Sequence, residues 1–451
     1  RSRCRGTVPS VTPNPGRHVD GRCDDERVSA PGCSAVVEDE GGVAEDIGKV
    51  VEEVWRREAG HVLAALLRRG DPLWDCEDAA QEALVAATQQ WPAAGVPENP
   101  RGWLIRVASR RLVDDHRSRE ARRRREIADA HRGEQDRAVH WTDRVGDLDD
   151  SLQVLVLCAH PSLSEASAVA LTLRAVAGLS TERIAAGLLC PSPTVAQRIS
   201  RAKQTLRERG ARFGPVPVAE LPRRLHAVRH TLHLIFTLGS TQLDGEALVD
   251  RSLTGEAIRL TERLHRALPR DSETTGLLAL MLLVDARTPA RTTRDGDLVP
   301  LRQQDRRSWD RRAIDRAVRL LEGCLAVGPV GPFQLQAAIA AVHATAATFA
   351  ETDWPQILEL YGMLRRLDPN PRVELGAAIA TGEVHGPLAG LEALAPLLRA
   401  HPDDHRVQAA HAHLLDAAGR PGAAMAYERA ATLARHPAER SYLRTRAAAS
   451  P

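Results

Sequence analysis

The amino-acid sequence predicts an all-α fold, and three observations support this prediction. Ala, Leu and Arg dominate the 451 residues and aromatic residues make up only 3%, a composition that favours helices over strands. Apolar residues recur with the spacing of one helical face, first at Val51, Val54, Trp55, Ala59, Val62, Leu63 and Leu66. Alternating runs of Val, Ile and Thr, which are typical of strands, do not occur. At roughly 150 residues per domain, the length indicates about three domains.

The composition also excludes several classes of protein. No apolar run approaches the roughly 18 residues that a membrane-spanning helix needs. The seven cysteines are too few and too scattered for a disulfide scaffold, so we expect free thiols and a cytoplasmic location. Positive and negative side chains nearly balance, with a net charge of +2. Any nucleic-acid surface must therefore arise from a local concentration of charge.

The first 44 residues are rich in Pro, Gly, Ser and charged residues, and we expect them to form a disordered tail. They contain no apolar stretch of the kind that a signal peptide needs. Helical spacing begins at Asp46 and ends at the sequence Gly-Asp-Pro of residues 70–72. A second helix is predicted from about Trp74 to Trp91.

The second helix carries acidic side chains on one face. Asp75, Asp78 and Glu82 lie at positions i, i+3 and i+7, and Gln81 is adjacent. Like charges at i and i+4 cost a few tenths of a kcal/mol in an isolated helix. The sequence leaves two interpretations open: this face binds a basic partner, or it is an ordinary solvated surface.

The third helix is strongly basic. Asn99 and Pro100 predict its start, as an N-cap followed by a proline in the first turn, and the pattern continues to about Arg125. Its arginines are Arg101, Arg106, Arg110, Arg111, Arg117, Arg119, Arg122, Arg123, Arg124 and Arg125. Leu104, Ala108 and Leu112 fall on another face. This local excess of positive charge favours the interpretation that the helix binds phosphate groups, rather than being an ordinary solvent-exposed surface.

A polar, acidic linker is predicted over residues 126–150, and three or four short helices over 151–210. Ser180 is expected to cap one helix of a helix-turn-helix, and Ser192, followed by Pro193, to cap the second. In the second helix Val195, Ile199, Ala202 and Leu206 should face inward. The side chains expected to reach base edges in a major groove are Thr194, Gln197, Arg198, Ser200, Arg201 and Lys203. A short helical hairpin of a structural domain is the alternative interpretation.

The sequence contains no catalytic motif. A phosphate-binding glycine loop, a nucleophile elbow, a His-Glu-x-x-His zinc motif and a Cys-x-x-Cys pair do not occur, so we expect neither an enzyme nor a cofactor. Three groups have residue types that bind metals: Cys158 with His160; His226, His230 and His233; and His401, His405, His411 and His413. None has a complete set of ligands in the sequence, so no metal site is predicted.

These features follow a fixed order in the chain, and that order resembles a known family. Residues 75–84 read Asp-Cys-Glu-Asp-Ala-Ala-Gln-Glu-Ala-Leu, residues 99–108 read Asn-Pro-Arg-Gly-Trp-Leu-Ile-Arg-Val-Ala, and the helix-turn-helix covers 180–208. Over about 45–212 the chain resembles bacterial sigma factors of the extracytoplasmic-function type, in the sigma-70 family. The resemblance implies region 2 at 45–125, the acidic linker at 126–150 and region 4 at 151–212.

Residues 213–451 are similar to a C-terminal extension found in one subgroup of these factors and related to tetratricopeptide repeats. Cys-Ala-His-Pro at 158–161, Gln-Gln-Asp-Arg at 303–306 with Trp309 and Asp310, and Thr-Asp-Trp-Pro at 352–355 match that subgroup. Residues 404–435 also follow the order of small and large residues of one repeat. Three departures stand out. Residues 237–240 read Thr-Leu-Gly-Ser instead of Asn-Glu-Gly-Tyr, Arg183 replaces a usual Glu, and Gly376 replaces a usual Asn.

The resemblance implies a function in transcription initiation. Asp75, Asp78, Gln81 and Glu82 would bind core RNA polymerase, and the α-helical repeat domain would bind a protein or a small molecule. Promoter DNA would be bound at the −10 element by Asn99, Arg101, Trp103, Arg106, Arg110 and Arg111, and at the −35 element by the six side chains of the helix-turn-helix named above. The alternative is a transcriptional regulator that binds duplex DNA through its helix-turn-helix and senses a signal through its repeats.

Overall fold

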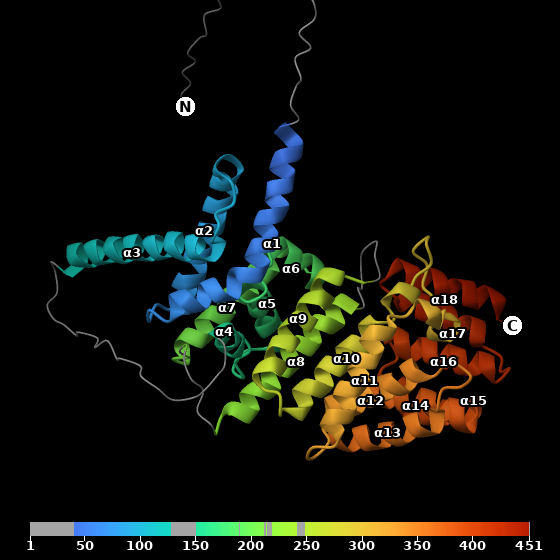
Figure 1. The fold of residues 1–451 in the computed structure, drawn as a ribbon. Helices are drawn as coiled ribbons and strands as arrows, with labels where there is room; N and C mark the ends of the chain where they lie inside the picture. The colour runs from blue at the N-terminus through green and yellow to red at the C-terminus, as the bar shows by residue number, and fades with distance from the viewer. Residues whose placement is uncertain are drawn as a thin grey trace, which may run out of the picture.

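The computed structural model describes residues 40–127, 150–188, 190–211, 213, 219–240 and 249–450 (Figure 1). Within these residues the regular elements are helices, and one isolated bridge joins Thr292 to Leu298. The all-α prediction is therefore confirmed. The first helix begins at Glu40, so the last five residues of the predicted 1–44 tail are helical. Residues 1–39 of that tail and residues 128–149 of the predicted acidic linker lie outside the described part.

Three helices form the N-terminal unit: α1 (Glu40–Leu67), α2 (Leu73–Ala94) and α3 (Pro100–Ile127). The Asn99 side chain accepts a hydrogen bond from the Gly102 amide at 2.9 Å, as expected of an N-cap. Leu104, Ala108 and Leu112 are buried and fix α3 on the unit. The other end of α3 projects away from the body of the molecule (Figure 1).

Four helices form the helix-turn-helix unit: α4 (Asp150–Cys158), α5 (Glu165–Ala175), α6 (Thr181–Leu188) and α7 (Ser192–Glu208). The Ser180 hydroxyl accepts from the Arg183 amide at 3.2 Å, which confirms the first predicted cap. The second predicted cap is wrong, because α7 starts one residue early. Pro191, in extended geometry, occupies the N-cap position and offers no side-chain acceptor.

The C-terminal array is a series of helices that pack mainly on their neighbours in the chain, as in repeat proteins. Figure 1 shows them following one another away from the other two units. They are α8 (Leu221–Ser240), α9 (Arg251–Ala267), α10 (Ser272–Asp285), α11 (Arg311–Leu325), α12 (Pro332–Thr345), α13 (Trp354–Leu367), α14 (Pro371–His385), α15 (Pro387–Ala400), α16 (His405–Ala417), α17 (Ala423–Leu433) and α18 (Pro437–Ala449). Three short 3-10 helices lie between α10 and α11.

One apolar core joins the three units. It runs without interruption from α1 to α12 and includes Trp55 of α1, Leu155 of α4, Val228 of α8 and Leu278 of α10. Helices α13–α18 are held instead by three smaller clusters. The first half of the array is therefore packed into the same core as the two units that precede it.

Two glycines have a steric explanation: Gly239, which residues 237–240 retain from the motif of the related subgroup, and Gly376, which is one of the three departures. A Cβ atom on Gly239 would lie 2.8 Å from the Thr254 amide nitrogen, because α8 and α9 touch there. The Gly239 carbonyl also accepts from the Asp250 amide at 2.7 Å. At Gly376, the Tyr361 hydroxyl already fills the space that a larger side chain would need.

The motif at residues 303–310 holds neighbouring helices of the extension together. The Arg306 guanidinium donates to the carbonyls of His343 and Ala346, each at 2.6 Å, and so caps the end of α12. The Trp309 ring lies beside two guanidinium groups, those of Arg287 at 5.4 Å and Arg306 at 4.9 Å. The motif thus ties α10, α11 and α12 together.

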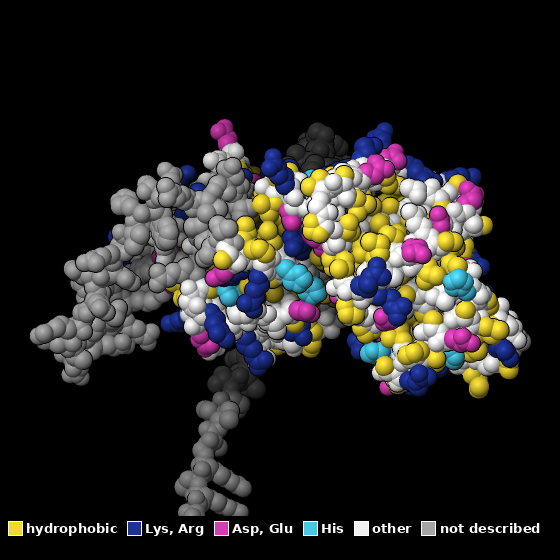
Figure 2. Space-filling model, turned by 90° about the horizontal axis from the view of Figure 1, so that it is seen from below, with side chains coloured by type: hydrophobic (Ala, Val, Ile, Leu, Met, Phe, Trp, Pro, Cys, Tyr) yellow, Lys and Arg dark blue, Asp and Glu magenta, His cyan; other side chains and the backbone are white. Residues whose placement is uncertain are grey.

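The surface seen in Figure 2 mixes positive, negative and hydrophobic side chains without a large area of one charge. Among the described residues, no helix combines the length and the apolar character needed to cross a membrane.

Candidate nucleic-acid and polymerase interface

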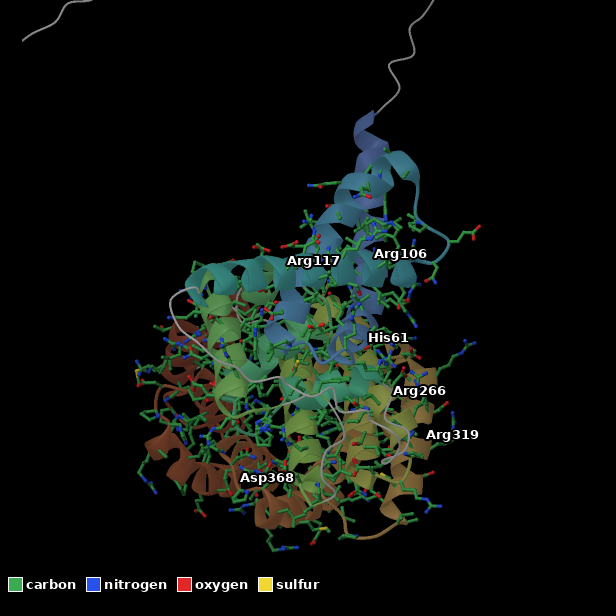
Figure 3. The ribbon with its side chains drawn as sticks, turned by 90° about the vertical axis from the view of Figure 1, so that its left-hand side faces the viewer. His61, Arg106, Arg117, Arg266, Arg319 and Asp368 are labelled. Carbon is green, nitrogen blue, oxygen red and sulfur yellow. The ribbon has the colours of Figure 1, made fainter. Side chains whose placement is uncertain are left out.

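The basic face of α3 is exposed. Arg106, Arg110 and Arg117 are accessible to solvent, and Figure 3 shows Arg106 and Arg117 along α3, apart from the labelled residues of the C-terminal array. Neither Arg106 nor Arg110 makes an ion pair or side-chain hydrogen bond within the described part of the chain. Buried aliphatic residues on the opposite face hold the backbone of α3, so these two arginines project from a packed helix and their charges are not neutralised within the described residues.

Two other arginines of the predicted −10 surface are already paired. Arg101 Nε lies 2.6 Å from Glu58 Oε2, and the Glu58 carboxylate is nearly buried. Arg111 Nε lies 3.2 Å from Glu82 Oε2, in an exposed pair. The positive charge that remains available is therefore concentrated at Arg106, Arg110 and further along α3.

Trp103 is half-buried. Its ring lies edge-on to the buried Trp91 ring, with centroids 5.5 Å apart. This geometry is favourable for aromatic pairs and fixes the ring at the base of the arginine row. Asn99 lies at the start of the same helix, where its side chain serves as the cap.

The acidic face of α2 divides into exposed and half-buried positions. Asp78 and Glu82 are exposed, with 71% of the Asp78 side chain accessible. Asp75 and Gln81 are half-buried. The predicted polymerase-binding residues thus share one side of α2, although Glu82 is paired with Arg111.

Sequence reasoning missed Glu77, a buried carboxylate beside this face. Arg174 Nε of α5 donates to Glu77 Oε1 at 3.0 Å, and Lys203 of α7 donates to the other oxygen. Burial alone would raise the pKa of Glu77, but the cations of Lys203 and Arg174 hold it below its usual value. No spacing in the sequence brings α5 and α7 to α2, so only the tertiary structure reveals this pair.

The predicted −35 residues do not all face solvent. Gln197, Ser200 and Arg201 are exposed on α7, and Thr194 and Arg198 are half-buried. Lys203 instead lies against α2, where its Nζ is 3.2 Å from Asp78 Oδ1 and only 16% of its side chain is exposed. The structure therefore joins one residue predicted to bind polymerase to another predicted to read DNA.

A groove of about 680 Å³ lies between Trp74, near the start of α2, and one side of α7. Trp74 lines it from α2, and Ser200, Lys203, Gln204, Arg207 and Glu208 line it from α7. The Arg207 guanidinium lies over the Trp74 ring at 5.2 Å. Contact between the two helices is thus polar at Lys203 and aromatic at Trp74.

The histidines considered as metal ligands contact side chains that do not complete a metal site. The His226 and His230 rings stack at 6.4 Å, His230 Nε2 is 3.0 Å from Glu165 Oε1, and His233 packs on Phe333. The sequence had given no sign of the Glu165 carboxylate. His160 Nδ1 accepts from the Ser162 amide at 3.1 Å. Across the described ranges, no cluster of three His, Cys, Asp or Glu side chains has metal-binding geometry.

Comparisons with known proteins agree with the order of these units. Residues 54–123 match the family model of sigma-70 region 2, residues 153–206 match that of sigma-70 region 4, and residues 224–325 match a family of unknown function (DUF6596). An uncharacterized protein of Rhizobium meliloti is 36% identical over 390 residues, which cover 85% of this chain and 91% of that protein. A probable ECF RNA polymerase sigma factor, SigI, of Mycobacterium tuberculosis is 30% identical over 161 residues, covering 35% of this chain and 54% of that protein. No solved structure matches.

Proposed function

Since the chain belongs to the sigma-70 family, as an extracytoplasmic-function sigma factor with a C-terminal extension, we propose that it recruits core RNA polymerase to promoters with −10 and −35 elements and opens the DNA there. In this proposal α1–α3 act as region 2 and α4–α7 as region 4. The polymerase performs the chemistry, and this chain supplies recognition without a cofactor. The observation that carries the proposal is the pair of exposed arginines on α3, Arg106 and Arg110, which make no ion pair within the described residues.

Arg106 and Arg110 would hold the opened strand at the −10 element. A guanidinium group binds phosphate through several donors and stacks on bases, so two of them one turn apart suit a single strand. Trp103 and Asn99 would contact bases near the start of α3. Arg101 and Arg111, whose charges Glu58 and Glu82 balance, would contribute less to binding.

The −35 element would be read by the exposed side of α7. Gln197 and Arg201 have the donors and acceptors that distinguish bases in a major groove. Thr194, Arg198 and Ser200 flank them and would contact phosphates. Lys203 would join them only after it leaves α2.

Core RNA polymerase would dock on α2 through Asp75, Asp78, Gln81 and Glu82. An exposed carboxylate such as Asp78 suits a basic partner surface, and complementary charge accelerates encounter. Because α2 and α3 belong to one rigid unit, docking on α2 would bring the arginine row of α3 to the DNA.

The test combines polymerase binding with transcription. The purified chain is mixed with bacterial core RNA polymerase, and co-elution on a sizing column measures binding. Run-off transcripts from a library of randomised promoters measure initiation. Arg106→Gln with Arg110→Gln should keep co-elution and lower transcript yield by at least about tenfold, since each lost hydrogen bond to a charged group is worth about 1.5–3 kcal/mol. Arg319→Gln, an exposed arginine of α11 (Figure 3), is the matched control and should change neither.

The result against the proposal is a folded chain that binds duplex DNA alone and never co-elutes with polymerase. That outcome would favour the duplex-DNA regulator with a helical sensor domain.

A further inference from the structure

We propose that the C-terminal extension binds a phosphate group, either free or carried by a small molecule, at a cationic cluster formed by Arg287, Arg306, Trp309 and His343. Arg287 follows α10, Arg306 and Trp309 belong to the segment before α11, and His343 lies on α12. Three of the four residues fall within the match to the family of unknown function. The inference goes beyond the proposed function, because it gives the extension a ligand of its own.

The cationic cluster holds two guanidinium groups against one aromatic ring. The central carbons of Arg287 and Arg306 lie 5.4 and 4.9 Å from the centroid of the Trp309 ring. The two carbons are therefore at most about 10 Å apart, a distance over which salt screens charges only in part. A ring face attracts a cation but carries no net charge, so the two positive charges repel each other across Trp309.

Arg287 carries the charge that is not compensated. Within the described residues it has no ion pair and no side-chain hydrogen bond, and its Nε atom is buried. Burial, followed by the nearby charges of Arg291 and Arg306, lowers the pKa of Arg287 to about 10. Arg306 differs, because its guanidinium donates to two backbone carbonyls at the end of α12. A buried charge without a partner is unfavourable, so Arg287 is the group that a ligand would satisfy.

The acidic side chains closest to the cluster along the chain have other partners. Asp305 pairs with its neighbour Arg307, and Asp310 accepts a hydrogen bond from an amide in the first turn of α11. Asp285 accepts from Thr288 Oγ1 at 3.5 Å. None of these three carboxylates forms an ion pair with Arg287 in the described structure, which leaves the cluster with an excess of positive charge.

Two further nitrogen atoms of the cluster are buried without a hydrogen-bond partner. They are Nε1 of Trp309, whose side chain is 3% exposed, and Nδ1 of His343. Burial, followed by the charges of Arg287 and Arg306, lowers the pKa of His343 to about 4. The ring is therefore neutral near pH 7, and one of its two nitrogens carries a hydrogen. Buried polar atoms normally have partners, so these positions favour a ligand with several acceptor oxygens.

A phosphate group suits the cluster better than a carboxylate does. It carries about 1.5–2 negative charges near pH 7 and offers three strong acceptor oxygens. It can therefore neutralise Arg287 and also accept from Trp309 or His343. A guanidinium group binds two oxygens of one phosphate through parallel hydrogen bonds. A carboxylate has a single charge and only two oxygens.

Urea denaturation of the full-length chain tests the site. Inorganic phosphate, phenyl phosphate and acetate are added separately, and sodium chloride keeps the ionic strength equal. We expect inorganic phosphate to raise the urea midpoint saturably, with half of the effect below about 1 mM, and calorimetric titration to give the same dissociation constant. Acetate should leave the midpoint unchanged. Tighter binding of phenyl phosphate would assign the site to a phosphorylated molecule, and weaker binding would assign it to free phosphate.

Arg287→Gln tests the residue that carries the proposal. It should weaken phosphate binding at least tenfold. In buffer without phosphate it should keep or raise the urea midpoint, because it removes a buried charge that has no partner. The matched control is Arg307→Gln in the same segment. The Arg307 side chain is 92% exposed, so this variant should respond to phosphate as the parent chain does.

Each remaining outcome would count against the proposal. A folded parent chain without a saturable response to phosphate would overturn it, and an equal response to acetate would overturn the choice of phosphate. An unchanged response in Arg287→Gln would mean that phosphate binds elsewhere, for example on α3. A lower midpoint of Arg287→Gln without phosphate would show that Arg287 stabilises the fold by itself. These measurements use neither polymerase nor promoter DNA, so they can fail while the proposed function holds, and the reverse.

Discussion

At the scale of one residue, Arg306 shows that a motif shared with the related subgroup can serve to hold the fold together. It is 5% exposed, and its guanidinium donates to two carbonyls of the α12 end and to Thr352 Oγ1. Arg306→Lys keeps the charge but cannot span these acceptors. We expect a loss of about 2–3 kcal/mol in the free energy of unfolding, measured by urea denaturation with tryptophan fluorescence.

Arg307 offers the matched control for Arg306. Its side chain is 92% exposed and pairs only with its neighbour Asp305 within the described structure, so Arg307→Lys should leave the urea midpoint unchanged. Equal losses for the two variants would contradict the capping role of Arg306.

His233 makes stability depend on pH. Burial, followed by the nearby His230 and Arg372 charges, lowers its pKa from 6.5 to about 4. Above pH 6.5 the His233 ring is neutral in both the folded and the unfolded chain. Between pH 6.5 and about 4 it binds a proton in the unfolded chain but stays neutral in the folded chain. The free energy of unfolding should therefore fall on acidification, by up to about 1.4 kcal/mol per pH unit.

The variant His233→Gln should reduce this pH dependence. Urea midpoints measured at pH 7, 6 and 5 should fall less steeply than those of the parent chain. Identical slopes for the two chains would mean that His233 protonates equally in the folded and unfolded states.

The candidate site was only partly predictable at this scale. The spacing of Leu104, Ala108 and Leu112 identified the buried side of α3 and hence its exposed arginines. It could not reveal that Lys203 meets Asp78, because the two are 125 positions apart and helical spacing says nothing about which helices pack together. Glu77 was missed for the same reason, since its partners come from α5 and α7.

Helix positions were more predictable than helix ends. Apolar spacing located the cores of α1, α2 and α3, and Asn99 marked the start of α3 because its side chain can accept a backbone hydrogen bond. At α7 the same rule misplaced the start by one residue, since Pro191 takes the extended geometry of an N-cap without offering an acceptor. Helix ends thus depend on backbone geometry that residue type alone does not fix.

The contact between α8 and α9 depends on the absence of a side chain at Gly239. Gly239→Ala would place Cβ 2.7 Å from the Leu253 Cβ and 2.8 Å from the Thr254 amide nitrogen, so the helices must separate. We expect a loss of about 1–3 kcal/mol, the usual cost of overpacking, measured as a lower urea midpoint.

Gly255 tests whether the loss at Gly239 comes from packing. It lies on α9, where an added Cβ atom would meet no other atom within 4 Å, so Gly255→Ala should stabilise the helix by up to about 1 kcal/mol. If Gly239→Ala and Gly255→Ala shifted the urea midpoint in the same direction, the steric argument would be contradicted.

At the scale of the whole molecule, the sequence indicated about three domains, whereas the structure shows three units that share a core. Apolar stripes identify which face of each helix is buried but not its partner. Val228 of α8 and Leu155 of α4 both lie in the core that begins in α1. Removing the extension would therefore expose apolar surface of the helix-turn-helix unit.

The distribution of the core predicts a gradient of stability along the chain. Helices α8–α12 belong to the large core shared with α1–α7, whereas α16–α18 are held by small clusters rich in alanine. Opening that exposes little apolar surface costs little free energy. Hydrogen exchange followed by mass spectrometry should therefore be at least about tenfold faster for amides of α16–α18 than for those of α8–α12. Equal protection would mean that the array unfolds as one cooperative body, and the end of the extension would then be as firmly held as the part that shares the large core.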